Sequence, residues 1–176
     1  MTSLRALRPA FVLALAATAF GQIKPQVQSA PAPDFLAYQA LFRNVVSLES
    51  QAAQADAAQG PNNSSSNWYR SQIAKEAGLT NVEYTALVAI AQDYAKAKAT
   101  YITARDAVMK DVQERQASGG KATWAEIVQL SNLFQQYLAS VNGHIAQVPV
   151  KLGAPGAQAL ANYVHTTVVA KTAWAR

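Results

Sequence analysis

The feature that most constrains the fold is a pair of Thr-x-x-Glu sequences, each followed by a long run of regularly spaced apolar residues. Thr80 precedes Glu83, and Thr123 precedes Glu126 at the same spacing. In a capping box the Thr hydroxyl accepts a hydrogen bond from the backbone N–H of the Glu, and the Glu carboxylate accepts one from the backbone N–H of the Thr. We therefore expect two long helices, one beginning at each Thr.

The apolar residues after each box recur at alternating spacings of three and four, which places them on one face of a helix. After the first box they are Leu87, Ile90, Tyr94, Ala97, Tyr101, Ala104 and Val108. After the second they are Ile127, Leu130, Phe134, Tyr137, Val141, His144 and Val148. Because a short Gly-Gly sequence separates the two runs, we expect an antiparallel helical hairpin over residues 80–118 and 123–148.

The region before the first box predicts two further helices. Asp34 is a good N-cap residue, and the apolar positions after it predict a helix that ends by Gly60-Pro61. Residues 62–66 are polar and predict a loop. A short helix over residues 67–77 should follow, with Trp68 and Ile73 on its apolar side and Gly78 at its end.

The region after residue 148 predicts two breaks. Pro149 should stop or kink the helix that begins at Thr123. Residues 152–156 (Leu-Gly-Ala-Pro-Gly) predict a break, with Pro155 in the first turn of a last helix. Since no stretch alternates convincingly with period two, the expected fold class is all-α, with four to five helices around the long hairpin.

The first 21 residues are typical of a secretory signal peptide. Arg5 and Arg8 precede an apolar run over residues 10–20, and small residues suited to signal peptidase end at Gly21. This run is about half the roughly 20 residues that a membrane span requires, so we expect cleavage near Gly21 and no stable membrane anchor afterwards. A Pro-containing leader over residues 22–33 and a single helical domain over residues 34–176 would follow. The expected location is periplasmic or secreted.

Composition limits how the exported chain can be stabilised and what it can bind. With no Cys there can be no disulfide, so stability must come from apolar packing. Without Arg5 and Arg8, 13 basic and 10 acidic residues remain, a net charge of +3. The basic residues are not clustered with base-stacking aromatics, so we expect no nucleic-acid binding.

No residue pattern indicates catalysis, a cofactor or a metal site. The chain contains no Cys and no Gly-x-Ser-x-Gly sequence. His144 and His165 lack a second metal ligand three or four positions away. The pairs Asp106–Lys110 and Asp111–Arg115 have the spacing of ion pairs on an exposed helix face. We therefore expect a protein that is not an enzyme.

Four aromatic residues on the two long helices are the candidate binding residues: Tyr94, Tyr101, Phe134 and Tyr137. They fall on the apolar stripes that should face each other. Their side chains could pack in the core with the hydroxyls at its edge. Alternatively, they could line a surface that holds apolar segments of other proteins.

The sequence Leu79-Thr80-x-x-Glu83 resembles the Leu-Thr-x-x-Gln motif of the Spy/CpxP family of periplasmic stress proteins, with Glu in place of Gln. The resemblance covers residues 79 to about 170. At the family's second motif, residues 152–156 keep Leu152 and have neither Thr nor Gln. The Met- and His-rich tracts of some members are also missing. The resemblance implies an ATP-independent chaperone or envelope-stress sensor that works as a cradle-shaped dimer of helical hairpins.

These observations predict an exported, non-catalytic protein that binds other proteins. Its partners would be protein clients or further copies of itself, for example in a homodimer. The alternative is a structural helical component of the cell envelope without client activity.

Overall fold

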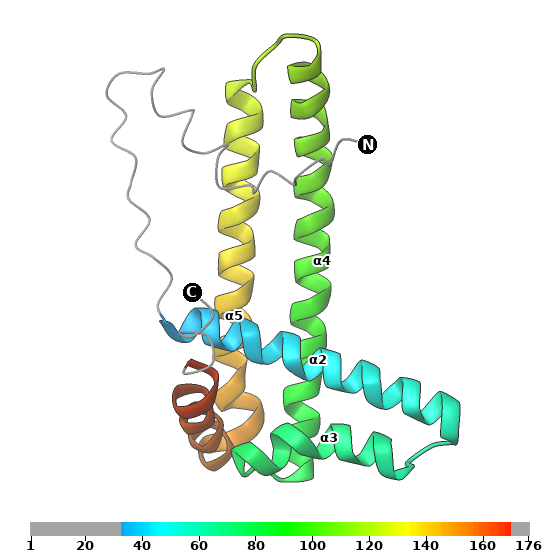
Figure 1. Ribbon diagram of the computed structural model, residues 1–176. Helices are drawn as coiled ribbons and strands as arrows, with labels where there is room; N and C mark the ends of the chain where they lie inside the picture. Colours follow the sequence, from blue (N-terminus) through cyan, green and yellow to red (C-terminus); the bar gives the residue numbers. More distant parts are fainter. Residues whose placement is uncertain (1–32, 170–176) are drawn as a thin grey trace. The chain divides into compact units, whose positions relative to one another are not determined.

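The computed structural model describes residues 33–169, which form four α-helices and no strand. The prediction of an all-α fold is confirmed. The helices are α2 (Pro33–Gln59), α3 (Ser64–Ala77), α4 (Asn81–Ala117) and α5 (Trp124–Tyr163), and a π-helical segment, η2 (Val164–Val168), follows α5 directly (Figure 1). The predicted signal peptide (residues 1–21), nearly all of the predicted leader (residues 22–32) and residues 170–176 lie outside the described residues.

Helix α2 supplies much of the core. Its predicted apolar stripe is buried at Leu41, Val45, Leu48 and Ala52. Phe42, which is also fully buried, packs its ring against Tyr94 of α4 with a centroid distance of 5.4 Å. The helix contacts α3, α4, α5 and η2 (Figure 1). The core therefore forms where the first part of α4 and the last part of α5 meet α2 and α3.

Helix α3 begins three residues earlier than the sequence predicted. The predicted loop over residues 62–66 was wrong in its second half, because Asn63 caps a helix that starts at Ser64. The side chain of Asn63 accepts a hydrogen bond from the backbone N–H of Ser66 and donates others to the carbonyls of Ala55 and Gly60. A run of serines can thus form the first turn of a helix when a side chain before it accepts hydrogen bonds from the free backbone N–H groups of that turn.

The predicted apolar side of α3 is correct at one residue and wrong at another. Ile73 is buried as predicted, with 1% of its surface exposed. Trp68 was predicted on the same apolar side, but 56% of its surface is exposed. Its indole ring lies edge-on against Tyr69 of the same helix.

Helices α4 and α5 lie side by side and run in opposite directions (Figure 1). Arg115 near the end of α4 pairs with Glu126 near the start of α5, and Tyr94 in the first half of α4 contacts His144 in the second half of α5. Gly119, with φ of +83°, lies in the connection between the helices. The order of these contacts fixes the direction of one helix against the other.

The interruption of α5 lies at Gly153 and not at Pro149. Gly153 has φ of 72° and ψ of 171°, which falls within the break predicted for residues 152–156. The helix continues through Pro149, and the only non-helical backbone angles inside α5 are those of Gly153, so this proline does not stop the helix. Proline's own φ of about −65° is helical. Pro149 also lies on the exposed side of α5, where the loss of one backbone hydrogen bond is least costly.

Candidate protein-binding surface

Tyr94 marks the point where the core ends along α4. Only 1% of its surface is exposed, and its ring packs against Phe42 of α2. Its hydroxyl oxygen lies 3.1 Å from that of Tyr137 on α5, at hydrogen-bonding distance. Every member of the buried core cluster on α4 lies at or before Tyr94.

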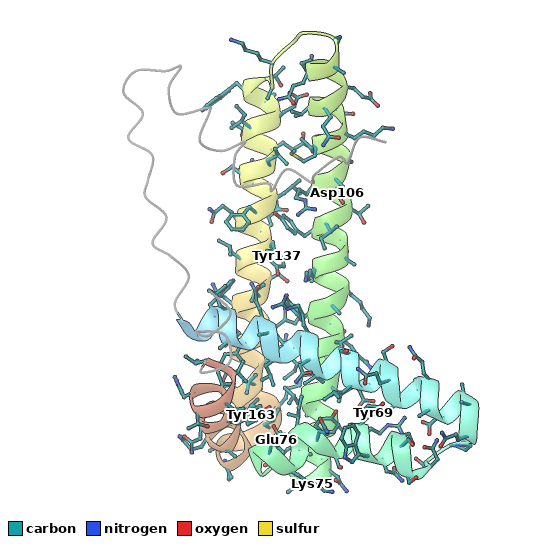
Figure 2. The ribbon with its side chains drawn as sticks, in the orientation of Figure 1. Tyr69, Lys75, Glu76, Asp106, Tyr137 and Tyr163 are labelled. Atoms are coloured by element: carbon teal, nitrogen blue, oxygen red, sulfur yellow. The ribbon has the colours of Figure 1, made fainter. Side chains whose placement is uncertain are left out.

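Tyr137 continues this aromatic contact along the two long helices (Figure 2). Its ring stacks on that of Tyr101, with centroids 4.6 Å apart and an angle of 15° between the planes. The guanidinium of Arg105 lies 5.9 Å from the centre of the Tyr101 ring. Burial and the hydrogen bond with Tyr94 raise the pKa of Tyr137, so its hydroxyl remains protonated at neutral pH. Tyr137 therefore contributes an uncharged side chain to the packing of α5 against α4.

His144 belongs to the same contact. It is half-buried, its Nδ1 atom lies 2.6 Å from the carbonyl oxygen of Ser140, and its ring meets the ring of Tyr94 edge-on. The ring of His144 is therefore held by a hydrogen bond and by aromatic packing at the edge of the core. Within residues 33–169, no three metal-ligating side chains gather in one place.

Three of the four predicted aromatic residues are therefore brought together, and the fourth is not. Phe134 is partly buried on α5 and makes no ring–ring contact within the described part of the chain. It belongs to a different set of side chains, the apolar residues on the outer parts of α4 and α5.

These outer apolar residues are only partly covered. Between Trp124 and Ser140, the single buried residue of α5 is the capping carboxylate Glu126. Beyond Tyr94, α4 buries only Val108 and Val112. We give the name distal surface to eight of the partly exposed apolar side chains of this region: Tyr101, Met109, Ile127, Val128, Leu130, Leu133, Phe134 and Leu138. In Figure 1 no described helix other than α4 and α5 lies beside this region.

The cap residues determine where each long helix begins. At the start of α4, the carboxylate of Glu83 accepts hydrogen bonds of 2.7 Å from both the backbone N–H and the hydroxyl of Thr80. The Thr80 hydroxyl in turn accepts one from the backbone N–H of Glu83. The bond from the Thr80 backbone is the main cause of a lowered pKa at Glu83. Leu79, directly before this cap, is buried in the core.

The cap at Thr123 and Glu126 has the same bonds and one more partner. The guanidinium of Arg115 lies 2.9 Å from a carboxylate oxygen of Glu126, and this contact adds to the two bonds from Thr123 in lowering the pKa of Glu126. The predicted pair of Asp111 with Arg115 was therefore wrong. The predicted pair of Asp106 with Lys110 was also wrong, because Asp106 binds its neighbour Arg105, and Lys110 lies near Glu114. Arg115 thus joins the end of α4 to the start of α5.

Sequence reasoning missed the polar contacts that hold α2, α3 and α5 to their neighbours. Arg70 of α3 binds Asp56 at 2.6 Å and lies 3.6 Å from Glu49, both on α2. Glu49 also accepts a hydrogen bond from the hydroxyl of Tyr84. Residues so far apart in sequence show no local pattern that would pair them.

A second missed contact lies at the other end of the core, where the hydroxyl of Tyr163 on α5 donates to the carboxylate of Glu76 on α3 (Figure 2). Burial and this bond raise the pKa of Tyr163 to about 12. Tyr163 is therefore protonated at neutral pH and acts as a donor that fixes α5 to α3.

Sequence reasoning also missed a groove between α2 and α4, which we call the α2–α4 groove. Its volume is about 230 Å³. Val46 of α2 and Ala95 and Ile102 of α4 form its apolar lining, and Arg43 and Lys98 border it. Arg43 and Lys98 lie on different helices, so only the fold brings them to one site.

Comparison with protein-family models, with curated proteins and with solved structures finds no match to this chain. Of the helices within residues 33–169, none combines the length and the apolar character needed to cross a bilayer.

Proposed function

We propose that this chain is an exported, non-catalytic protein that binds other proteins through its distal surface, as a chaperone does. The observation that carries the proposal is the incomplete burial of the distal surface. The eight apolar side chains of the distal surface are partly exposed, and in Figure 1 no described third helix lies beside this part of α4 and α5. Exposed apolar side chains that gather on one part of a surface are characteristic of protein-interaction sites.

The geometry supports a binding role because the rest of the protein fixes the surface in place. Both long helices start at capping boxes, and Arg115 joins them at one end. The stacked Tyr101 and Tyr137 rings join them at the border of the core. A surface held in this way loses little conformational entropy when a partner binds.

The sequence supports the same proposal from two other directions. Residues 1–21 have the pattern of an export signal, and the Leu79-Thr80-x-x-Glu83 motif resembles that of the Spy/CpxP stress proteins. A chaperone that works without ATP holds and releases its clients by equilibrium binding, to which apolar contact contributes strongly. Partly exposed apolar side chains are suited to such binding.

An aggregation assay tests the proposal. The mature protein, in excess, should slow the light scattering of reduced α-lactalbumin, an unfolded client. The double variant Val128→Gln/Phe134→Gln should suppress aggregation less well, because it removes apolar area from the distal surface. The control is Val82→Gln/Val150→Gln, which also replaces two apolar side chains by Gln, at valines that are 80% and 81% exposed elsewhere. Equal suppression by the two double variants would exclude the distal surface as the binding site.

The alternative, a structural envelope component without client activity, makes a different prediction. The wild-type protein would then fail to slow aggregation, and size-exclusion chromatography with cross-linking would show a large stoichiometric assembly. A discrete dimer that slows aggregation would instead agree with the proposed binding role.

A further inference from the structure

We infer that the α2–α4 groove selects client segments in which a carboxylate stands beside a large apolar side chain, that is, acidic amphipathic peptides. The inference rests on the proposed protein-binding function and names the chemistry of the segments preferred. It assigns a second contact site, separate from the distal surface.

The shape of the groove suits one side chain and not a whole small molecule. Its volume of about 230 Å³ is smaller than the roughly 300–1,000 Å³ of typical small-molecule pockets, and it is open to solvent on one side. Ala95 and Ala99, one turn apart on α4, leave the helix surface low at this point. Val46 and Ile102 add apolar contacts on either side. A partner's aliphatic side chain can enter while its backbone remains outside.

The charges at the border of the groove indicate which segment would be preferred. Among residues 35–169, neither Arg43 nor Lys98 lies within 4.0 Å of a carboxylate. A carboxylate beside the inserted side chain would therefore meet two cations that are not already neutralised.

Three acidic residues on the same two helices, Glu49, Asp93 and Asp106, are already paired with other cations. Glu49 lies near Arg70. On α4, Asp93 pairs with Lys96 and Asp106 with Arg105. None of these carboxylates thus competes for the positive border of the groove. Complementary charge contributes specificity more than affinity, which fits selection among many apolar segments.

Fluorescence anisotropy with two labelled helical peptides tests the inference on the mature protein. One peptide contains Leu, Ala and Glu, and the other has Gln in place of every Glu. Two partly exposed ion pairs should make the Glu peptide bind roughly threefold to tenfold more tightly than the Gln peptide, and the difference should shrink in high salt. The variant Arg43→Gln/Lys98→Gln should abolish the difference in affinity between the two peptides.

The matched control is Lys75→Gln/Lys151→Gln, which removes the same charge from two exposed lysines that border no part of the groove. It should retain the preference for the Glu peptide. A preference lost equally in both double variants would show a general effect of net charge and overturn the inference. Full displacement of the Glu peptide by micromolar dodecanoate would also overturn it, because the groove would then be a site for amphipathic anions. The inference would also be overturned if the wild-type protein were a dimer that the variant Arg43→Gln/Lys98→Gln dissociates. The occupant of the groove would then be a second copy of this chain.

The aggregation assay and the peptide-binding assay together distinguish a failure of this inference from a failure of the proposed function. If wild-type protein slows α-lactalbumin aggregation but binds both peptides equally, the groove inference fails and the protein-binding function stands. If the protein neither slows aggregation nor binds either peptide, both fail.

Discussion

Gly156 of α5 lies directly against the carboxylate of Glu83 at the start of α4, so close that a methyl group at position 156 would overlap the carboxylate oxygen Oε1. The other oxygen of that carboxylate, Oε2, closes the capping box with Thr80. The missing side chain at Gly156 therefore lets the last part of α5 pack onto the capped first turn of α4.

This contact predicts opposite effects for the same substitution at two glycines of α5. Gly156→Ala should lower the free energy of unfolding by about 1–3 kcal/mol, because the new methyl group must displace Glu83. Gly143→Ala is the control, since Gly143 is exposed and a Cβ there would meet no atom within 4 Å. It should raise the free energy of unfolding by about 0.5–1 kcal/mol, the usual gain from Ala over Gly inside a helix. Urea denaturation measures both, and equal stability of the two variants would contradict the contact.

The capping boxes themselves predict a second set of stability changes. Thr80→Ala and Thr123→Ala should each lower the free energy of unfolding by about 1 kcal/mol, because each leaves helix N–H groups without their side-chain partner. Thr85→Ala is the matched control, since the Thr85 hydroxyl only bonds to the carbonyl of Asn81 within the same helix. Its stability should equal or slightly exceed that of the wild type. Thermal unfolding followed by circular dichroism distinguishes these cases, and a loss at Thr85 as large as at Thr80 would argue against the caps.

Much of this fold follows from local sequence, and the candidate site does not. The caps at Thr80 and Thr123 involve residues three positions apart, so the sequence alone locates the starts of α4 and α5. The burial of Leu41 and Val45 follows in the same way from helical spacing. The pairing of Arg115 with Glu126 depends on how two helices meet, and a local i,i+4 rule assigned Arg115 to Asp111 instead.

The apolar residues of α4 and α5 have similar spacings, so spacing alone does not distinguish the core from the distal surface. Tyr94 and Phe134 occupy equivalent positions in their apolar stripes, yet Tyr94 is fully buried and Phe134 is not. The difference arises because α2 packs against α4 at Tyr94 through the ring of Phe42, whereas in Figure 1 no described helix other than α4 lies beside the first part of α5. Periodicity shows which face of a helix is apolar. It does not show how many other helices cover that face.

The lowered pKa values of Glu83 and Glu126 predict acid sensitivity. Both carboxyl groups have folded-state pKa values below the ordinary 4.5, because their ionised forms accept the hydrogen bonds of the caps. Their contribution to stability is therefore present above pH 4.5 and lost as the pH falls through the lowered values. The variant Glu83→Gln/Glu126→Gln keeps a capping oxygen at each site but cannot be protonated. Its melting temperature should fall less steeply with acid below pH 4.5 than that of the wild type, with parallel curves from neutrality to pH 4.5. Identical curves throughout would exclude this source of acid sensitivity.

The hydroxyl pair of Tyr94 and Tyr137 predicts an unequal effect of two similar substitutions. Tyr137→Phe leaves the hydroxyl of Tyr94, a residue only 1% exposed, without its partner, and a buried unsatisfied polar group costs about 1–3 kcal/mol. Tyr94→Phe should lower the free energy of unfolding less, because the half-buried Tyr137 can bond to water instead. Tyr101→Phe is the control: within residues 33–169 its hydroxyl makes no hydrogen bond, and its stacked ring is retained. Urea denaturation of the three variants should rank the losses as Tyr137→Phe, then Tyr94→Phe, then Tyr101→Phe near zero. A larger loss for Tyr94→Phe than for Tyr137→Phe would show that the Tyr94 hydroxyl has another partner or reaches water.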